Sequence, residues 1–308
     1  MNAFKAQLLR ELWEHPMLYV APIVIGALLL VACVVGLSMA SSFGTMISIS
    51  IEGLDPADLA YAEAGIALAL LAFLPAFFLP VVAIISFYLL ECLGNERRDR
   101  SILFFKSLPV SDLMTVLAKL ATALLVVPAL AVAALAVTHV GALILGTIGL
   151  SFAGGGVVSL WSPGRLLSVW TLAAYSAFAA ALWYSPVYCF FLAVSAWARR
   201  ATLVWASSPL LLILIEQSLR GRSLMQELIG AHMAGFWATA YAHRVQVSLA
   251  DSNTAETMHD LDPATFSNVW AWMDPVALMA SPALWGGLVV AVGFTGIAVM
   301  LRRYRDDT

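Results

Sequence analysis

The chain has 308 residues, of which 62% are hydrophobic and only 11% are charged, and its formal net charge is −3. Soluble domains carry roughly 25% charged residues, so a water-facing surface is excluded for most of this chain. The mean hydropathy of +0.90 agrees with that exclusion. The solvent for most of the chain is therefore lipid, where the backbone satisfies its own hydrogen bonds in helices or in a closed barrel.

The apolar stretches are each about 20 residues long and lack the polar–apolar alternation of barrel strands, which indicates transmembrane helices. We expect an all-α integral membrane protein with about six transmembrane helices in a single transmembrane domain, residues 1–308. The spans are placed at approximately 17–40, 64–90, 113–138, 165–197, 202–219 and 277–301. The first stretch is too long for a signal-peptide core and follows Glu11 and Glu14, so we expect it to remain uncleaved.

Residues 1–16 are expected to form an amphipathic helix in the headgroup plane, although a simple lead-in to the first span is an alternative. Its apolar side carries Phe4, Leu8 and Leu12, and its polar side carries Lys5, Gln7, Arg10, Glu11 and Glu14. Residues 139–163 begin apolar but contain glycines 154–156 and Pro163, so we place them outside the bilayer as a surface or re-entrant segment. The external segment 220–276 is expected to add outer re-entrant or surface helices before the last span.

The basic residues predict the orientation, because Lys and Arg accumulate on the cytoplasmic side of membrane proteins. If both termini are cytoplasmic, twelve of the sixteen lie inside or at the inner boundary. Arg165, Arg220, Arg222 and Arg244 then lie outside. We therefore expect a multi-pass protein of the plasma (inner) membrane with both termini in the cytoplasm.

The segment 91–112 joins the second and third spans on the predicted cytoplasmic side and combines charges with a large apolar cluster. The apolar residues are Ile102, Leu103, Phe104, Phe105 and Leu108. A cluster of this size on a loop that faces water suggests a partner surface, although it could also lie back into the headgroup layer. After it, Pro109 stops any preceding helix, and Ser111 is expected to cap the third span with Asp112 in its first turn.

This segment resembles the first cytoplasmic loop of permease subunits in the ABC-2 family of ABC transporters. In that family a charged stretch after the second span leads to an apolar turn that ends Leu-Pro-Val-Ser, and a lysine follows early in the third span. The matching positions here are Glu96, Arg97, Arg98, Asp99, Arg100, Leu103, Leu108, Pro109, Val110, Ser111 and Lys119. The motif covers about 25 residues, and the remaining likeness lies in the helix layout.

The resemblance implies that the loop forms a short coupling helix, which docks on a separate ATPase subunit. The implied ATPase-binding residues are Glu96, Arg97, Arg98, Arg100, Leu103, Phe104, Phe105, Leu108 and Pro109. Arg199 and Arg200 are implied as a second, smaller contact, and the alternative for them is a role as topology anchors. The implied partners are two copies of the ABC ATPase, which would bind ATP and Mg²⁺, together with a second permease copy and membrane lipid, but no nucleic acid.

The chain has no G-x-x-x-x-G-K-[ST] phosphate loop, so we expect it not to be an enzyme by itself and to contain no cofactor. The three cysteines fit neither a zinc site nor a disulfide framework, and we expect no metal site. The main alternative is a membrane-embedded, metal-dependent hydrolase that uses the external residues His232, His243, His259, Asp251, Asp260 and Asp262. A third possibility is an ABC complex that transmits force or signal without transport.

Lys119 and Glu216 are predicted to lie near span ends, where their side chains can reach the interface. Few other ionisable groups lie in the central parts of the spans, which disfavours a proton-coupled or ion-coupled transporter. A lipid-like, peptide or amphipathic substrate fits this composition better.

Overall fold

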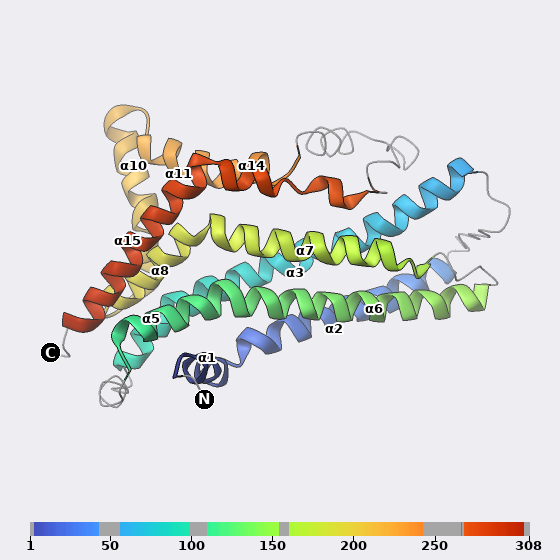
Figure 1. Cartoon of the computed structure of the whole chain (residues 1–308), viewed down its shortest axis with the longest axis horizontal. Coiled ribbons are helices and arrows are strands. Elements are labelled where there is room, and N and C mark those ends of the chain that lie inside the picture. The colour runs from blue at the N-terminus through green and yellow to red at the C-terminus, as the bar shows by residue number, and fades with distance from the viewer. Residues whose placement is uncertain are drawn as a thin grey trace.

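The computed structural model describes residues 3–42, 56–98, 110–153, 160–242, 266 and 268–304. Nearly all of these residues are helical, and they form no strand (Figure 1). The longer helices are α1 (Ala3–Glu14), α2 (Met17–Ser42), α3 (Pro56–Arg98), α5 (Asp112–Ala121), α6 (Val127–Ala153), α7 (Pro163–Trp183), α8 (Ser185–Trp197), α10 (Ser208–Arg220), α11 (Leu224–Ala240) and α15 (Pro282–Tyr304). The short elements are the π-helix η1 (Thr122–Val126), α9 (Thr202–Ala206), the 3₁₀-helix η4 (Val269–Trp272) and α14 (Pro275–Ala280). The predicted all-α class is therefore confirmed.

Within the described part, five helical segments are long and apolar enough to cross a membrane. They are Met17–Met39, Ala60–Glu96, Asp112–Phe152, Pro163–Trp183 and Pro282–Tyr304. Helix α3 alone has 43 residues and is about 64 Å long, twice the hydrocarbon thickness of a bilayer. The predicted fifth span corresponds to α9 and α10, which are interrupted at Ser207, so the count of six remains a prediction.

The third span was predicted to end near residue 138, whereas the helix itself continues to Ala153. Residues 139–153 are apolar and contain no proline, so nothing ends the helix before the glycines that follow. Pro128 leaves the helix unbroken because the π-helix η1 precedes it, where the Val127 amide donates to the Thr122 carbonyl. This wider turn accommodates a proline that would otherwise clash with the preceding carbonyls.

The predicted fourth span, 165–197, is divided at Tyr184 into α7 and α8. Pro186 lies in the first turn of α8, where its missing amide hydrogen is tolerated. The sequence anticipated a bend at this proline, and the structure places the break two residues before it.

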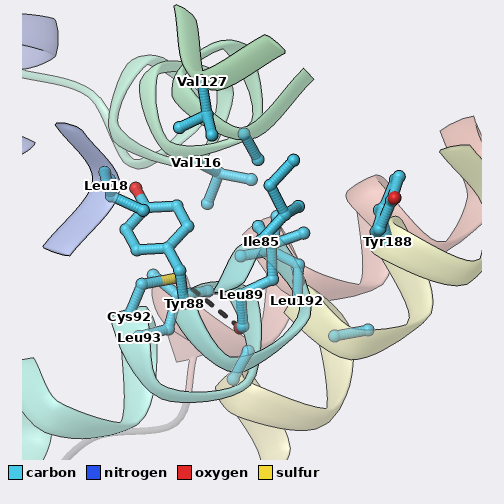
Figure 2. Close-up of a cluster of buried hydrophobic side chains, with 14 of the residues drawn as sticks. Leu18, Ile85, Tyr88, Leu89, Cys92, Leu93, Val116, Val127, Tyr188 and Leu192 are labelled. Carbon is cyan, nitrogen blue, oxygen red and sulfur yellow. Dashed lines mark hydrogen bonds between the residues drawn. The ribbon is translucent and has the colours of Figure 1, made fainter. Parts of the chain in front are cut away.

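The main buried cluster lies where α3, α8 and α15 pack around the start of the α5–η1–α6 helix (Figure 2). Helix α3 contributes Tyr88, Leu89 and Cys92, and α8 contributes Tyr188 and Leu192. Many apolar side chains outside this cluster are exposed, notably along α2 and α10. Large exposed apolar surfaces are rare in soluble proteins and ordinary in lipid, so they agree with a membrane protein.

A close approach of α2 and α6 generates a stability prediction. A Cβ at Gly26 would lie 2.4 Å from Oγ1 of Thr138, whereas a Cβ at Gly36 would meet nothing within 4 Å. Gly26→Ala should therefore lower the free energy of unfolding by about 1–3 kcal/mol through overpacking. Gly36→Ala, the matched control in the same helix, should be neutral or stabilising by up to about 1 kcal/mol. Denaturant titration in detergent measures both, and equal effects would contradict the close packing.

Candidate functional site

The described part of the predicted coupling segment consists of its two ends, the last turns of α3 and the start of α5. Arg100, Leu103, Phe104, Phe105, Leu108 and Pro109 lie outside the described residues, and the side chains of Arg97 and Arg98 are not described either. At the α5 end, Ser111 Oγ accepts a hydrogen bond from the Met114 amide at 3.2 Å, and Asp112 occupies the first turn. The predicted helix cap at Ser111 is therefore confirmed.

Both ends of this segment are held by one arginine of the last helix. Arg302, in α15, donates from Nη1 to Oε2 of Glu96 and from Nε to Oδ1 of Asp112, the latter at 3.1 Å. Glu96 lies near the end of α3, and Asp112 begins α5. Arg302 and Glu96 are each 6% exposed, so their ion pair is shielded from water, whereas Asp112 is 28% exposed. The two ends of the segment are thus fixed relative to each other and to α15.

Lys119 extends the network to the N-terminal helix. Its Nζ donates to both carboxylate oxygens of Glu11, at 2.8 and 3.0 Å, and lies 2.9 Å from Oε1 of Glu96. The Tyr88 hydroxyl donates to Oε2 of Glu11 at 2.8 Å. Lys119 and Glu11 are both 0% exposed, so the prediction that Lys119 reaches the interface is wrong. The buried carboxylates give this lysine a better partner than the headgroups.

Arg10 completes the network on α1. Its Nε lies 2.7 Å from Oε1 of Glu14, and its Nη2 lies 3.1 Å from Oε1 of Glu96. Burial lowers the pKa of Arg10, but the hydrogen bond to Glu14 and the charges of Glu14, Glu96 and Glu11 outweigh it and raise that pKa above its ordinary value. This network, which we call the charge network, consists of Arg10, Glu11, Glu14, Glu96, Asp112, Lys119 and Arg302. It joins α1, α3, α5 and α15 through charge-assisted hydrogen bonds.

The middle of the polar side of α1 faces the protein, whereas Lys5 and Glu14 are exposed. Gln7 and Glu11 are buried, whereas Trp13 is 79% exposed. In Figure 1, α1 is seen nearly end-on while α2, α3 and α6 run along the long axis, so α1 lies across the bundle. The sequence predicted this helix but not its orientation, because the partner Lys119 follows Glu11 by 108 residues. A lone lysine in an apolar helix was the signal that a buried carboxylate must face it.

The other predicted site residues lie apart from the charge network. Arg199 and Arg200 are exposed in the turn between α8 and α9, and no described contact joins them to the network. His232 is on α11, where its ring stacks on Trp183 with a centroid distance of 5.0 Å. Its Nε2 donates to the Trp183 carbonyl at 3.0 Å, and Trp183 Nε1 donates to the His232 carbonyl at 2.7 Å. His243 and His259 lie outside the described residues.

Among the described residues, one group of potential metal ligands lies close together: Glu11, Glu14 and His15. Both oxygens of Glu11 already accept hydrogen bonds from Lys119, and those of Glu14 accept from Arg10. A metal ion here would displace two cations, so these carboxylates are better matched to the charge network than to a metal. The three cysteines are unpaired.

Comparisons with family models, with curated proteins and with solved structures found no match. The fold therefore defines the chain only as an all-α protein of the membrane type. Its charge network joins the two ends of the segment 99–109 to the first and last helices.

Breaking the charge network should be strongly destabilising. Lys119→Met leaves Glu11 buried without its cation, which should lower the free energy of unfolding by about 3–5 kcal/mol. Lys119→Met combined with Glu11→Gln should cost less than the sum of the two single changes, because the pair is coupled. Arg220→Gln removes an exposed pair with Glu216 and should cost at most about 1 kcal/mol. Denaturant titrations in detergent would contradict the network if Lys119→Met cost no more than this control.

His15 should make stability depend on pH. Its ring lies edge-on to Tyr88 at 4.9 Å, facing Glu11, Glu14, Glu91 and Lys119. Burial lowers the pKa of His15 below its ordinary value of 6.5, so the folded protein binds this proton less readily than the unfolded chain. The stability due to neutral His15 is present above the unfolded pKa and is lost as pH falls below it.

His15→Phe keeps the ring contact but removes the titration. We expect a shallower decline of the free energy of unfolding between about pH 7 and pH 5, measured by denaturant titration at several pH values. Identical pH slopes for the variant and the unaltered chain would show that His15 titrates alike in the folded and unfolded states.

Proposed function

We propose that the chain is the permease subunit of an ATP-driven ABC exporter, and that it forms the substrate pathway as a dimer. A separate ATPase subunit, present in two copies, would bind ATP and Mg²⁺ and dock on the segment 96–109. The proposal places both termini and this segment in the cytoplasm, and it takes the second permease copy to be identical.

The observation that carries the proposal is the bridge from Arg302 to Glu96 and Asp112. A docking loop can transmit force only if its ends move together with the spans. Because one buried guanidinium holds both ends, a displacement of the loop is passed directly to α15, and through Glu96 and Lys119 to α1. Buried ion pairs resist separation because each unpaired charge would carry a large desolvation penalty.

The helix that follows Lys119 supplies a place where such a displacement can be absorbed. The π-helix η1 begins three residues after this lysine and precedes Pro128. Insertions of this kind are common at functional sites in helices, because the local hydrogen-bond pattern can be rearranged without unfolding. In this mechanism α5 moves with the loop, and η1 separates that movement from the long helix α6.

The hydrolase alternative receives less support from the site. A metal-dependent hydrolase needs histidine nitrogens directed at an ion, whereas Nε2 of His232 is engaged by the Trp183 carbonyl. An ABC complex that transmits force or signal would use the same linkage as an exporter, and it remains the closest alternative. The resemblance of residues 96–119 to ABC-2 permeases applies equally to both.

A photo-crosslinking experiment tests the docking surface. We expect p-benzoylphenylalanine at Phe104 to crosslink, in living cells, to a protein that carries a G-x-x-x-x-G-K-[ST] phosphate loop, identified by mass spectrometry. The control places the same residue at Phe152, which is 88% exposed near the far end of α6 and should give no such adduct.

A second measurement uses the triple variant Leu103→Ser, Phe104→Ser and Phe105→Ser. It should lose copurification of the crosslinked ATPase, because the apolar contact surface is removed, while the helical content of the permease is unchanged. If a tag near Asn95 were accessible only from outside intact cells, no ATPase could reach the segment and the proposal would fail.

A further inference from the structure

The turn between α8 and α9 has a well-defined conformation, and the proposed function assigns it no role. Arg199 and Arg200 are adjacent and exposed at its tip, between buried Ala198 and the first residue of α9. Ala201 has a left-handed backbone, with φ 53° and ψ 48°, which reverses the chain within a few residues. A non-glycine residue in this region is strained, so packing on both sides must hold the turn.

Two tryptophans flank this turn and contact each other. The rings of Trp197, at the end of α8, and Trp205, in α9, meet edge to face with a centroid distance of 4.2 Å. They are 40% and 44% exposed, so each presents part of its ring to the surroundings. Partly exposed tryptophans of this kind are typical of the membrane–water interface, where the ring is apolar and the N–H is wet.

Aliphatic side chains are exposed on both helices that follow the turn. Leu203 and Val204 of α9 are each 60% exposed, and beyond Trp205 more than half of each of five further side chains is exposed on α10: Leu210, Leu211, Leu212, Leu214 and Ile215. The turn thus places two guanidinium groups beside an aromatic pair and a large aliphatic surface. A phospholipid combines the matching groups, which are a phosphate, glycerol esters and acyl chains.

The two arginines also lack the acidic partners that other arginines have. Arg10, Arg165, Arg220 and Arg302 each form an ion pair with a carboxylate. Across the described residues, no carboxylate forms an ion pair with Arg199 or Arg200. Two adjacent, uncompensated guanidinium groups are suited to bind a phosphate.

We propose that this turn binds the phosphodiester headgroup of an anionic phospholipid, with Arg199 and Arg200 at the phosphate, Trp197 and Trp205 near the ester region, and the exposed aliphatic side chains of α9 and α10 along an acyl chain. The site does not depend on an ATPase partner. The exposed aliphatic surface beside the arginines favours a lipid, whose acyl chains would cover it, over the acidic surface of a soluble protein.

The test is a titration of the purified full chain with phosphatidylglycerol in detergent, followed by native mass spectrometry, with phosphatidylcholine as the neutral comparison. Arg199→Gln with Arg200→Gln should weaken the apparent affinity for phosphatidylglycerol about tenfold or more and leave phosphatidylcholine unaffected. The control Arg220→Gln with Arg222→Gln removes the same charge at the turn between α10 and α11. It should change either affinity less than about twofold, because Glu216 already compensates Arg220 and the single remaining arginine, Arg222, does not form an adjacent pair.

Three outcomes would overturn the proposal. The first is equal retention of the two lipids by the unaltered chain. The second is an unchanged preference for phosphatidylglycerol in the Arg199 and Arg200 double variant, and a loss of ATPase copurification in that variant would then assign the turn to the protein partner. The third is displacement of phosphatidylglycerol by inorganic phosphate at equal concentration, which would show an anion site without a lipid component. None of these outcomes bears on the crosslink at Phe104, so the two proposals fail independently.

Discussion

The ion pair between Lys119 and Glu11 is the interaction on which the arrangement at this end of the protein depends. Each of these groups would be prohibitively costly to bury alone, and together with Glu96 and Arg302 they form a set in which every charge has an opposite partner. The network also decides how α1 lies, because the carboxylate of Glu11 must reach a lysine in another helix. Such a set contributes less to net stability than to specifying one arrangement of helices, which is the property that the proposed transmission of force would require.

The remaining helix contacts follow from lipid as the solvent. Lipid tails are as apolar as leucine, so burial of apolar side chains does not drive these helices together, and close packing and polar contacts must do so. The approach of α2 to α6 at Gly26 is one such contact. Another is His139, whose Nδ1 accepts from Trp170 Nε1 at 3.2 Å while its Nε2 donates to the Leu70 carbonyl at 3.0 Å. This neutral imidazole joins three helices without a charge.

The sequence was sufficient for features that depend on local composition. Apolar runs predicted the membrane helices, and the Pro109–Asp112 stretch predicted the cap at Ser111. It was insufficient where a distant partner decides the outcome. Glu11 and Lys119 are 108 residues apart, and Glu96 and Arg302 are 206 apart, so no local pattern could pair them. The continuation of α6 to Ala153 was missed although residues 139–153 are apolar and contain no proline, because the span was ended at the length that crosses a bilayer.

The polar contacts that hold the helices together are of two chemical kinds, neutral hydrogen bonds and ion pairs. Away from the charge network several polar contacts between helices are neutral, as in the reciprocal bonds of Trp183 with His232 and in the pair formed by Tyr241 and Ser176. Charges are gathered where α3 ends and α5 begins, next to the segment that we propose as the docking site. A neutral hydrogen bond holds a helix in place at little desolvation cost, whereas an ion network resists separation of its members more strongly. The strongest joint is therefore placed beside the segment that we propose as the docking site.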